Sequence, residues 1–314
     1  MGDRMTNKIF KTLDEQIEIL KNKGLVITDV DKAKSILFRE NYFFLSGYRH
    51  LFMKKYRDSK FIEGTTFEEL YSTFLFDRKL RNIMFKYILV IENNIKSIVS
   101  YQLSRKYGIR ESEYLNPDNY VEDPCKERQL KDILNKMRRQ IRVNSKQHSA
   151  TMHYTTNYGY IPLWVVVKVL SFGIIAEFFN VLKDEDQYAI ANVYNVNSEV
   201  LSTYLSLLAN YRNVCAHEDI LYDHRTQKSI PDNKYHQFLD IEKEFGVYKY
   251  GKNDLFSLII MMKELLSDSE FIEMLNEVSY EVKLLDEKIN TVETTPILNK
   301  LGFPNNWEKI REIN

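Results

Sequence analysis

The sequence predicts an all-α protein built as a multi-helix bundle with an N-terminal helical extension. Helix-breaking residues are scarce in the 314-residue chain, which contains only 10 Gly and 6 Pro, whereas 21 Tyr and 18 Phe supply large groups for packing helices together. Residues 67–107 contain neither Gly nor Pro, and apolar side chains recur there at helical spacing. Capping-box patterns, in which a Thr and a following Glu satisfy free amide groups at a helix start, occur at Thr12 and Thr66.

The expected helices follow one another with short connections. Residues 67–107 predict one long helix or two nearly continuous ones, and Pro162 is expected to open an apolar helix over residues 161–179. Residues 108–123 are expected to form a loop, and the polar, Thr-rich residues 144–160 are the best candidate for a mobile segment. The remaining expected elements are helices at 126–142, 184–193, 198–217, 254–266 and 270–289, a short helix at Trp307, and a short strand at 247–250.

Charge, cysteine content and hydropathy limit the class of protein. Lys and Arg number 44 and Asp and Glu number 44, so the net charge is zero and nucleic-acid binding would require a local basic patch. Cys125 and Cys215 supply no disulfide framework, which fits a reducing cytosol. Residues 161–179 are apolar enough to pass for a membrane span, but Lys168 near their centre favours a buried helix. The first ten residues carry no apolar signal-peptide core, so we expect a cytoplasmic protein without a membrane partner.

The candidate catalytic residues lie at the end of the 198–217 helix. Arg212, Asn213 and His217 form an Arg-Asn-x-x-x-His motif in which Asn213 and His217 share one helix face. The azimuth of Arg212 differs from that of His217 by about 140°, but its long side chain can bring the guanidinium to the same phosphate. Histidine can transfer protons near neutral pH, and arginine offers a planar fork of donors to a phosphate. RNA supplies its own nucleophile, the ribose 2′-OH, so we expect neither a metal nor another cofactor.

A structural interpretation of the same motif stays open. A histidine near a helix C-terminus interacts favourably with the helix dipole, and the stem of an arginine covers apolar surface. A short Arg-to-His pattern also arises by chance, as a looser one from Arg142 to His148 illustrates.

Four blocks of sequence carry a resemblance to known proteins. Residues 209–217, Ala-Asn-Tyr-Arg-Asn-Val-Cys-Ala-His, resemble the signature of HEPN-type ribonucleases. Residues 41–49, 76–92 and 161–173 resemble the N-terminal, long-helix and central-helix blocks of the Abi-like abortive-infection proteins of bacteria, the AbiD/AbiF group. The resemblance covers residues 10 to 225.

This resemblance implies a helical bundle of the HEPN type and a part in phage defence by RNA cleavage or growth arrest. It also implies a homodimer in which two copies of Arg212, Asn213 and His217 form one composite site. Glu218 and Asp219 depart from the pattern, because acidic residues are not expected directly after the histidine of an RNA-binding site. The regions expected along the chain are an N-terminal helical region with the long helix (1–110), a basic and polar inserted segment (111–160), a HEPN-like helical region (161–290) and a C-terminal tail (291–314).

A second candidate site is the basic segment 126–146, in which eight Lys or Arg stand against two acidic residues. Such a segment is either an RNA-backbone footprint or a solvated helix face. The candidate RNA-binding residues are Arg128, Lys131, Arg138, Arg139 and Arg142. Three nearby tyrosines are expected either to pack at the rim of the core or to stack on unpaired bases: Tyr154, Tyr158 and Tyr160.

Polar residues within the long helix are expected to be structural. Asp77, Arg78 and Arg81 predict an internal ion pair, although Arg78 or Arg81 could instead contact RNA. Glu92 and Asn93 interrupt an apolar run and predict a polar contact inside the bundle rather than catalysis.

These observations lead to one main functional hypothesis and two alternatives. The main hypothesis is a metal-independent endoribonuclease of a phage-defence system, with RNA as substrate. The first alternative is a non-catalytic or conditionally active RNA-binding protein that holds a small structured non-coding RNA. The second is a toxin that acts on another protein, in which the motif is structural.

Overall fold

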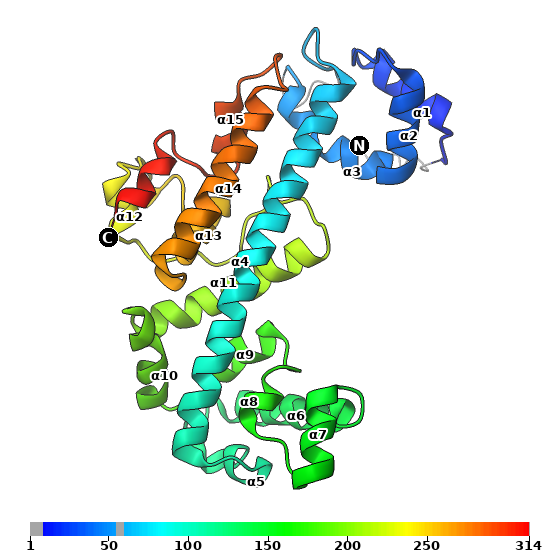
Figure 1. Cartoon of the computed structure of the whole chain (residues 1–314). Coiled ribbons are helices and arrows are strands. Elements are labelled where there is room, and N and C mark those ends of the chain that lie inside the picture. The colour runs from blue at the N-terminus through cyan, green and yellow to red at the C-terminus, as the bar shows by residue number, and fades with distance from the viewer. Residues whose placement is uncertain (1–8, 55–59, 314) are drawn as a thin grey trace, which may run out of the picture.

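The computed structural model describes residues 9–54 and 60–313, and it is mostly helical, with 66% helix and 3% strand. The all-α prediction is therefore confirmed. Figure 1 shows a crescent with one long helix as its spine. The N-terminal helices lie at one end of the spine, and helices from the middle of the chain lie at the other, so that the crescent is open on one side.

The spine is α4 (Phe67–Tyr107), whose 41 residues correspond to a length of about 60 Å. It starts where the capping box predicts, since the Glu69 amide donates to the Thr66 hydroxyl and the Thr66 amide donates to the Glu69 carboxylate. The same carboxylate accepts hydrogen bonds from the amides of Asn290 and Thr291, both at 2.7 Å. The 67–107 prediction is confirmed as one continuous helix, and its start is tied to the C-terminal part of the chain.

The N-terminal lobe packs on the first half of α4. Thr12 opens its first helix with the expected capping box. Tyr48 and Phe52 are buried and attach the lobe to the spine. The elements of this lobe are α1 (Leu13–Asn22), α2 (Val30–Glu40), α3 (Tyr42–Ser46) and the 3₁₀ helix η1 (Gly47–Phe52).

The middle lobe lies at the far end of α4. Its elements are α5 (Glu111–Tyr114), η2 (Pro117–Asn119), α6 (Glu127–Asn144), α7 (Ser149–Tyr158), α8 (Leu163–Val166) and α9 (Phe172–Phe179). The basic helix expected at 126–142 is confirmed as α6. The candidate mobile segment 144–160 contains the helix α7, because the Thr151 hydroxyl donates to the carbonyls of Asn144 and His148 and closes the turn between the two helices.

The prediction of a single apolar helix over residues 161–179 is wrong, because the chain forms α8 and α9 with a break between them. The Ser171 side chain accepts a hydrogen bond from the Ile174 amide and so starts a new helix. Lys168 lies in the break and donates to Asn93 of α4 at 2.7 Å, which keeps its charge out of the core. Within residues 9–54 and 60–313, no helix is long and apolar enough to cross a membrane.

The rest of the chain returns along α4. α14 packs lengthwise on the spine, and α13 is almost wholly buried beside it. The helices expected at 184–193, 254–266 and 270–289 and the short strand at 247–250 are confirmed, with bounds shifted by a few residues. The elements are α10 (Asp184–Ala191), η3 (Asn192–Tyr194), α11 (Ser198–Ala216), α12 (Lys234–Phe238), β1 (Lys243–Glu244) paired antiparallel with β2 (Val247–Tyr248), α13 (Leu255–Leu265), α14 (Asp268–Asp286), α15 (Thr294–Lys300) and η4 (Trp307–Glu312).

Candidate active site

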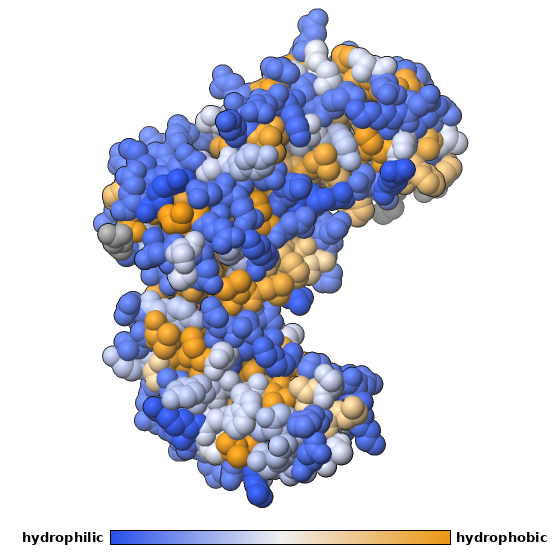
Figure 2. Space-filling model, in the orientation of Figure 1, coloured by the Kyte–Doolittle hydropathy of each residue, from blue (hydrophilic) through white to orange (hydrophobic). Residues whose placement is uncertain are grey.

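α11 carries the Arg-Asn-x-x-x-His motif. Its start is fixed by Asn197, whose side-chain oxygen accepts a hydrogen bond from the Val200 amide at 2.8 Å. The helix packs against α9 and α4 through one buried face, formed by Leu201, Leu205, Leu208, Tyr211 and Val214. This packing brings the C-terminal end of α11 out on the open side of the crescent (Figure 1). Figure 2 shows that the molecular surface is hollowed on that side.

The end of α11 places the motif at a sharp change of chain direction. The helix ends at Ala216, one residue before the expected end, and the His217 amide still donates to the Asn213 carbonyl at 2.9 Å. Glu218 then adopts a φ of 57°, in the left-handed region that turns the chain out of the helix. His217 is therefore the C-cap residue of α11, and its backbone hydrogen bond ties it to the last turn of the helix.

The Arg212 side chain lies against α4. Its Nε is 3.8 Å from Glu92 Oε2, and its guanidinium carbon is 5.8 Å from the centre of the Phe85 ring. Glu92 also accepts a hydrogen bond from Lys96 at 2.7 Å, so its carboxylate stands between two cations. Glu92 is buried, which confirms the prediction of a polar contact inside the bundle. The Arg212–Glu92 contact is an ion pair without a hydrogen bond, and with it the Arg212 side chain lies toward α4.

Asn213 and His217 present unengaged side chains on the open side. Both are exposed, and neither side chain makes a hydrogen bond or ion pair with any of the residues that the structure describes. Being four residues apart, they share one face at the helix end. The structure thus brings Asn213 and His217 together as predicted, while it turns Arg212 toward α4, with 35% of its side chain exposed.

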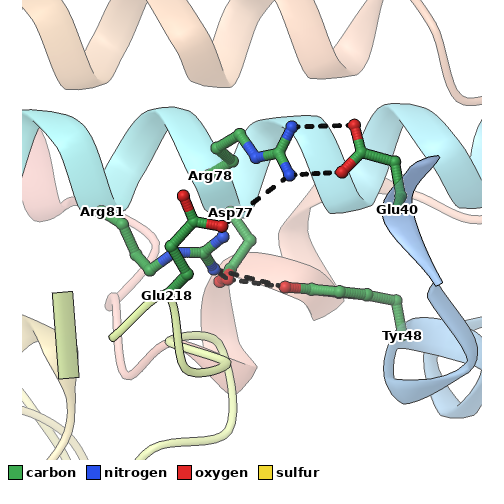
Figure 3. A network of polar contacts seen from close by, with 6 residues as sticks. All are labelled: Glu40, Tyr48, Asp77, Arg78, Arg81 and Glu218. Atoms are coloured by element: carbon green, nitrogen blue, oxygen red, sulfur yellow. Dashed lines mark hydrogen bonds and ion pairs between the residues drawn. The ribbon is translucent and has the colours of Figure 1, made fainter. Parts of the chain in front are cut away.

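A buried network holds the segment that follows His217. The Asp77 carboxylate accepts hydrogen bonds from the Tyr48 hydroxyl at 2.7 Å and from the Leu221 amide at 3.2 Å, and it pairs with Arg81 (Figure 3). Burial raises the pKa of Asp77, and the adjacent Arg81 opposes this shift. An internal ion pair was predicted among Asp77, Arg78 and Arg81, and it is confirmed between Asp77 and Arg81. Its link to Leu221, 144 residues away, was not predicted, because no local pattern marks it.

A second, more exposed layer of charges covers this network. Arg78 donates to both oxygens of Glu40, at 3.0 and 2.6 Å, and this hydrogen bonding raises the pKa of Arg78. Glu218 approaches the other side of the same guanidinium, at 4.0 Å, as Figure 3 shows. The acidic residue after the motif histidine thus lies near an arginine of α4, a position that sequence reasoning did not anticipate.

Two further titratable side chains lie in this region, a buried cysteine thiol and a histidine that makes a hydrogen bond. Burial raises the pKa of the Cys215 thiol to about 12, so the thiol is protonated at neutral pH. His224 hydrogen-bonds Asn210 at 2.9 Å, and burial lowers its pKa. Within residues 9–54 and 60–313, no group of three or more His, Cys, Asp or Glu is arranged to hold a metal ion.

The five candidate RNA-binding residues of the basic segment share one face of α6. At about 100° per residue they fall within an arc of about 100°, opposite the buried face. The buried face consists of Leu130, Ile133, Leu134 and Met137. Arg128, Lys131, Arg138, Arg139 and Arg142 are all exposed. Arg138 donates to the Leu115 carbonyl at 3.2 Å, whereas the other four make no hydrogen bond or ion pair with the described residues.

The three predicted tyrosines form a cluster at the rim of the middle lobe. The ring centres of Tyr154 and Tyr158 are 5.3 Å apart, and those of Tyr158 and Tyr160 are 6.5 Å apart. The Arg110 guanidinium lies 5.4 Å from the Tyr160 ring centre. Packing at the rim is confirmed for this cluster, and stacking on unpaired bases stays a prediction.

Comparison with known proteins identifies the family. The sequence profile of the Abi-like proteins matches residues 35–223, from α2 to the segment just after the motif. The match covers more than half of the chain, so the chain belongs to the Abi-like protein family. This membership indicates a part in abortive infection, a defence against phage. No curated protein and no solved structure matches the chain.

Proposed function

We propose that this Abi-like protein is a metal-independent endoribonuclease of the HEPN type, of the AbiD/AbiF group, that acts in phage defence. One observation carries the proposal: His217 and Asn213 stand exposed and unengaged at the end of α11, which also carries Arg212, an arginine that forms an ion pair with Glu92 at 3.8 Å. A purely structural role would leave the two exposed side chains without a purpose. The proposal agrees with the family to which the chain belongs.

Each residue has a role in a transesterification. One His217 accepts the proton of the ribose 2′-OH while O2′ forms a bond to phosphorus. The bond from phosphorus to O5′ breaks, and a protonated histidine gives its proton to the leaving oxygen. Arg212 stabilises the charge on the phosphate, and Asn213 orients the histidine or a phosphate oxygen. The products are a 2′,3′-cyclic phosphate and a 5′-OH.

The second histidine in this scheme comes from a second copy of the chain. His217 is exposed at the C-terminal end of α11, and this end of the helix faces the open side of the crescent (Figure 1), so two α11 ends can meet there across a two-fold axis. A homodimer supplies one histidine as base and the other as acid. Helices α4 and α11 of both copies then form the HEPN-type composite site.

The test is cleavage of a mixed RNA pool in EDTA by the wild type and by His217→Ala. The wild type should produce cyclic-phosphate ends, and His217→Ala should produce none while keeping the wild-type circular dichroism spectrum and oligomeric state. His153→Ala removes another exposed histidine and serves as the control, since it should retain cleavage. Equal cleavage by wild type and His217→Ala would disprove the role of His217.

A second candidate function is a scaffold that holds a structured non-coding RNA. The specific observation in its favour is the single basic face of α6, where four cations have no partner among the described residues. A surface of this kind binds the phosphate backbone without reading sequence. Copurification of one discrete, intact RNA with the wild type, and its loss in Arg138→Ala/Arg139→Ala/Arg142→Ala, would support this function.

A further inference from the structure

A cavity of about 390 Å³ lies next to the motif, where the segment after His217 meets the N-terminal lobe. Its walls come from α2, α3, α4 and the turn at residues 218–220. The volume is in the range of pockets that bind small organic molecules. Because Glu218 directly follows His217, a molecule in this cavity is within one residue of the proposed catalytic group.

The cavity offers aromatic surfaces. Phe38 is 79% exposed and Phe44 is 45% exposed, both at the rim. Phe74 lies deeper, and the Arg78 guanidinium covers its ring at 4.6 Å from the centre. Exposed aromatic rings that line a cavity are suited to stack on a flat ring system.

The cavity also offers one free cation and one weakly engaged carboxylate. Arg39 is exposed at the rim and makes no hydrogen bond or ion pair within residues 9–54 and 60–313. Glu218 is 69% exposed, and its nearest cation is Arg78 at 4.0 Å, beyond hydrogen-bond distance. The two terminal guanidinium nitrogens of Arg78 already donate to Glu40. The cavity therefore combines a donor for a phosphate with an acceptor for N–H groups.

Backbone strain is concentrated at the same cavity. Five described residues other than glycine have a positive φ, and two of them, Asn41 at 67° and Glu218 at 57°, line it. Such conformations are costly for residues with side chains and persist where the surrounding structure holds them. Here the Asn41 side chain accepts a hydrogen bond from the Phe43 amide, and the Asp77 network holds the chain just after Glu218.

We propose that this cavity binds one unpaired base of the RNA substrate, next to the cleaved phosphate, and that Glu218 makes it prefer guanine. The substrate class rests on the proposed nuclease function. Guanine presents N1–H and N2–H side by side, which match the two oxygens of one carboxylate. Adenine and cytosine present only an amino group there, and uracil only one imino N–H. Phe38 and Phe44 stack on the base, and Arg39 binds the neighbouring phosphate.

Binding to the full-length His217→Ala chain tests the pocket without relying on cleavage. The probes are short single-stranded oligoribonucleotides, uridine throughout or with one central guanosine, labelled for fluorescence anisotropy. The guanosine probe should bind about tenfold more tightly, as one bidentate contact allows. Adding Glu218→Gln should remove this preference. The matched control is Asp219→Asn, which removes the same charge one residue further on and should keep the preference.

Arg39→Ala should weaken the binding of both probes equally and leave the ratio of the two affinities unchanged. Its control is Lys32→Ala, which removes another exposed cation of α2. Equal affinity for both probes, or an equal loss of preference in Glu218→Gln and Asp219→Asn, would overturn the inference. The inference would also be overturned if Phe44→Ala dissociated a dimer but kept the preference for the guanosine probe. The rim of the cavity would then be a contact with a second copy of the chain. If the guanosine probe bound more tightly but the wild type cleaved no RNA, the proposal of a base-binding cavity would stand and the proposed nuclease function would be rejected.

Discussion

Replacing Glu92 with Gln should both destabilise the protein and weaken RNA cleavage, because the Glu92 carboxylate holds two cations. The side chains of Glu92 and Lys96 are 9% and 10% exposed and their charged atoms are 2.7 Å apart. Removing one partner of a buried ion pair costs about 3–5 kcal/mol, because the other charge stays buried without compensation. We expect a loss of about 3 kcal/mol for Glu92→Gln, at the low end because the Gln oxygen still accepts a hydrogen bond.

A double-mutant cycle separates the ion pair from general effects of substitution. Lys96→Met should cost less, about 2 kcal/mol, because Glu92 keeps Arg212 at 3.8 Å as a partner. The double variant Glu92→Gln/Lys96→Met leaves no buried charge at the pair. It should therefore be more stable than the sum of the single changes predicts, by at least about 1.5 kcal/mol.

The assay is urea unfolding at pH 7, followed by circular dichroism, for the wild type and the three variants. The reasoning would be refuted if the changes in the free energy of unfolding of the two single variants summed to that of the double variant within about 0.5 kcal/mol. Such additivity would show that Glu92 and Lys96 are not coupled. Cleavage gives a second readout that separates position from stability. Glu92→Gln releases Arg212 and should lower cleavage at least about tenfold, whereas Lys96→Met, which does not touch Arg212, should not.

Three further outcomes follow from other parts of the structure. Gly47→Ala should destabilise by at most about 1 kcal/mol, because the added methyl group would meet only Cδ1 at the end of the partly buried Ile220 side chain, and Gly47→Ala/Ile220→Val should remove this loss in urea unfolding. Burial raises the pKa of the Asp254 carboxyl to about 6, so the folded state binds this proton more tightly than the unfolded chain does. Stability from this group is therefore present below the unfolded pKa near 4 and is lost as the pH rises to about 6. Between pH 4 and pH 7 the free energy of unfolding of the wild type should fall by about 3 kcal/mol relative to Asp254→Asn, and a constant difference would contradict the shift. Arg138→Ala/Arg139→Ala/Arg142→Ala should weaken RNA binding and reduce the slope of log affinity against log salt by about 2, whereas an unchanged slope would exclude this face from the RNA contact.

The candidate site was visible in the sequence only as a set of residue types. The spacing of Asn213 and His217 predicts a shared helix face, and the structure places both on it. The sequence predicts that the side chains of Arg212 and His217 converge, but Arg212 forms an ion pair with Glu92 of α4. In the sequence, Glu92 is recognisable only as a polar residue within an apolar run. No pattern in the chain relates the two, because their contact depends on how α11 crosses α4.

The same distinction applies to the fold. Local patterns were sufficient for α4 and for the capping boxes at Thr12 and Thr66, since these depend on interactions between residues close in the chain. Residues 161–179 predict one helix, because apolar side chains predominate among them. The break appears only when Lys168 reaches Asn93 of α4 and Ser171 starts a new helix.

By itself, the sequence determined that this chain folds as helices, where the longest of them begins and ends, and which three side chains form the candidate catalytic motif. Periodicity, capping and the absence of breakers act over a few residues, so they can be read directly. Only the tertiary structure decided that Asp77 holds Leu221, that Glu92 holds Arg212, and that a cavity opens beside Glu218. Each of these joins segments far apart in the chain, and their meeting is set by the packing of whole helices rather than by any local preference.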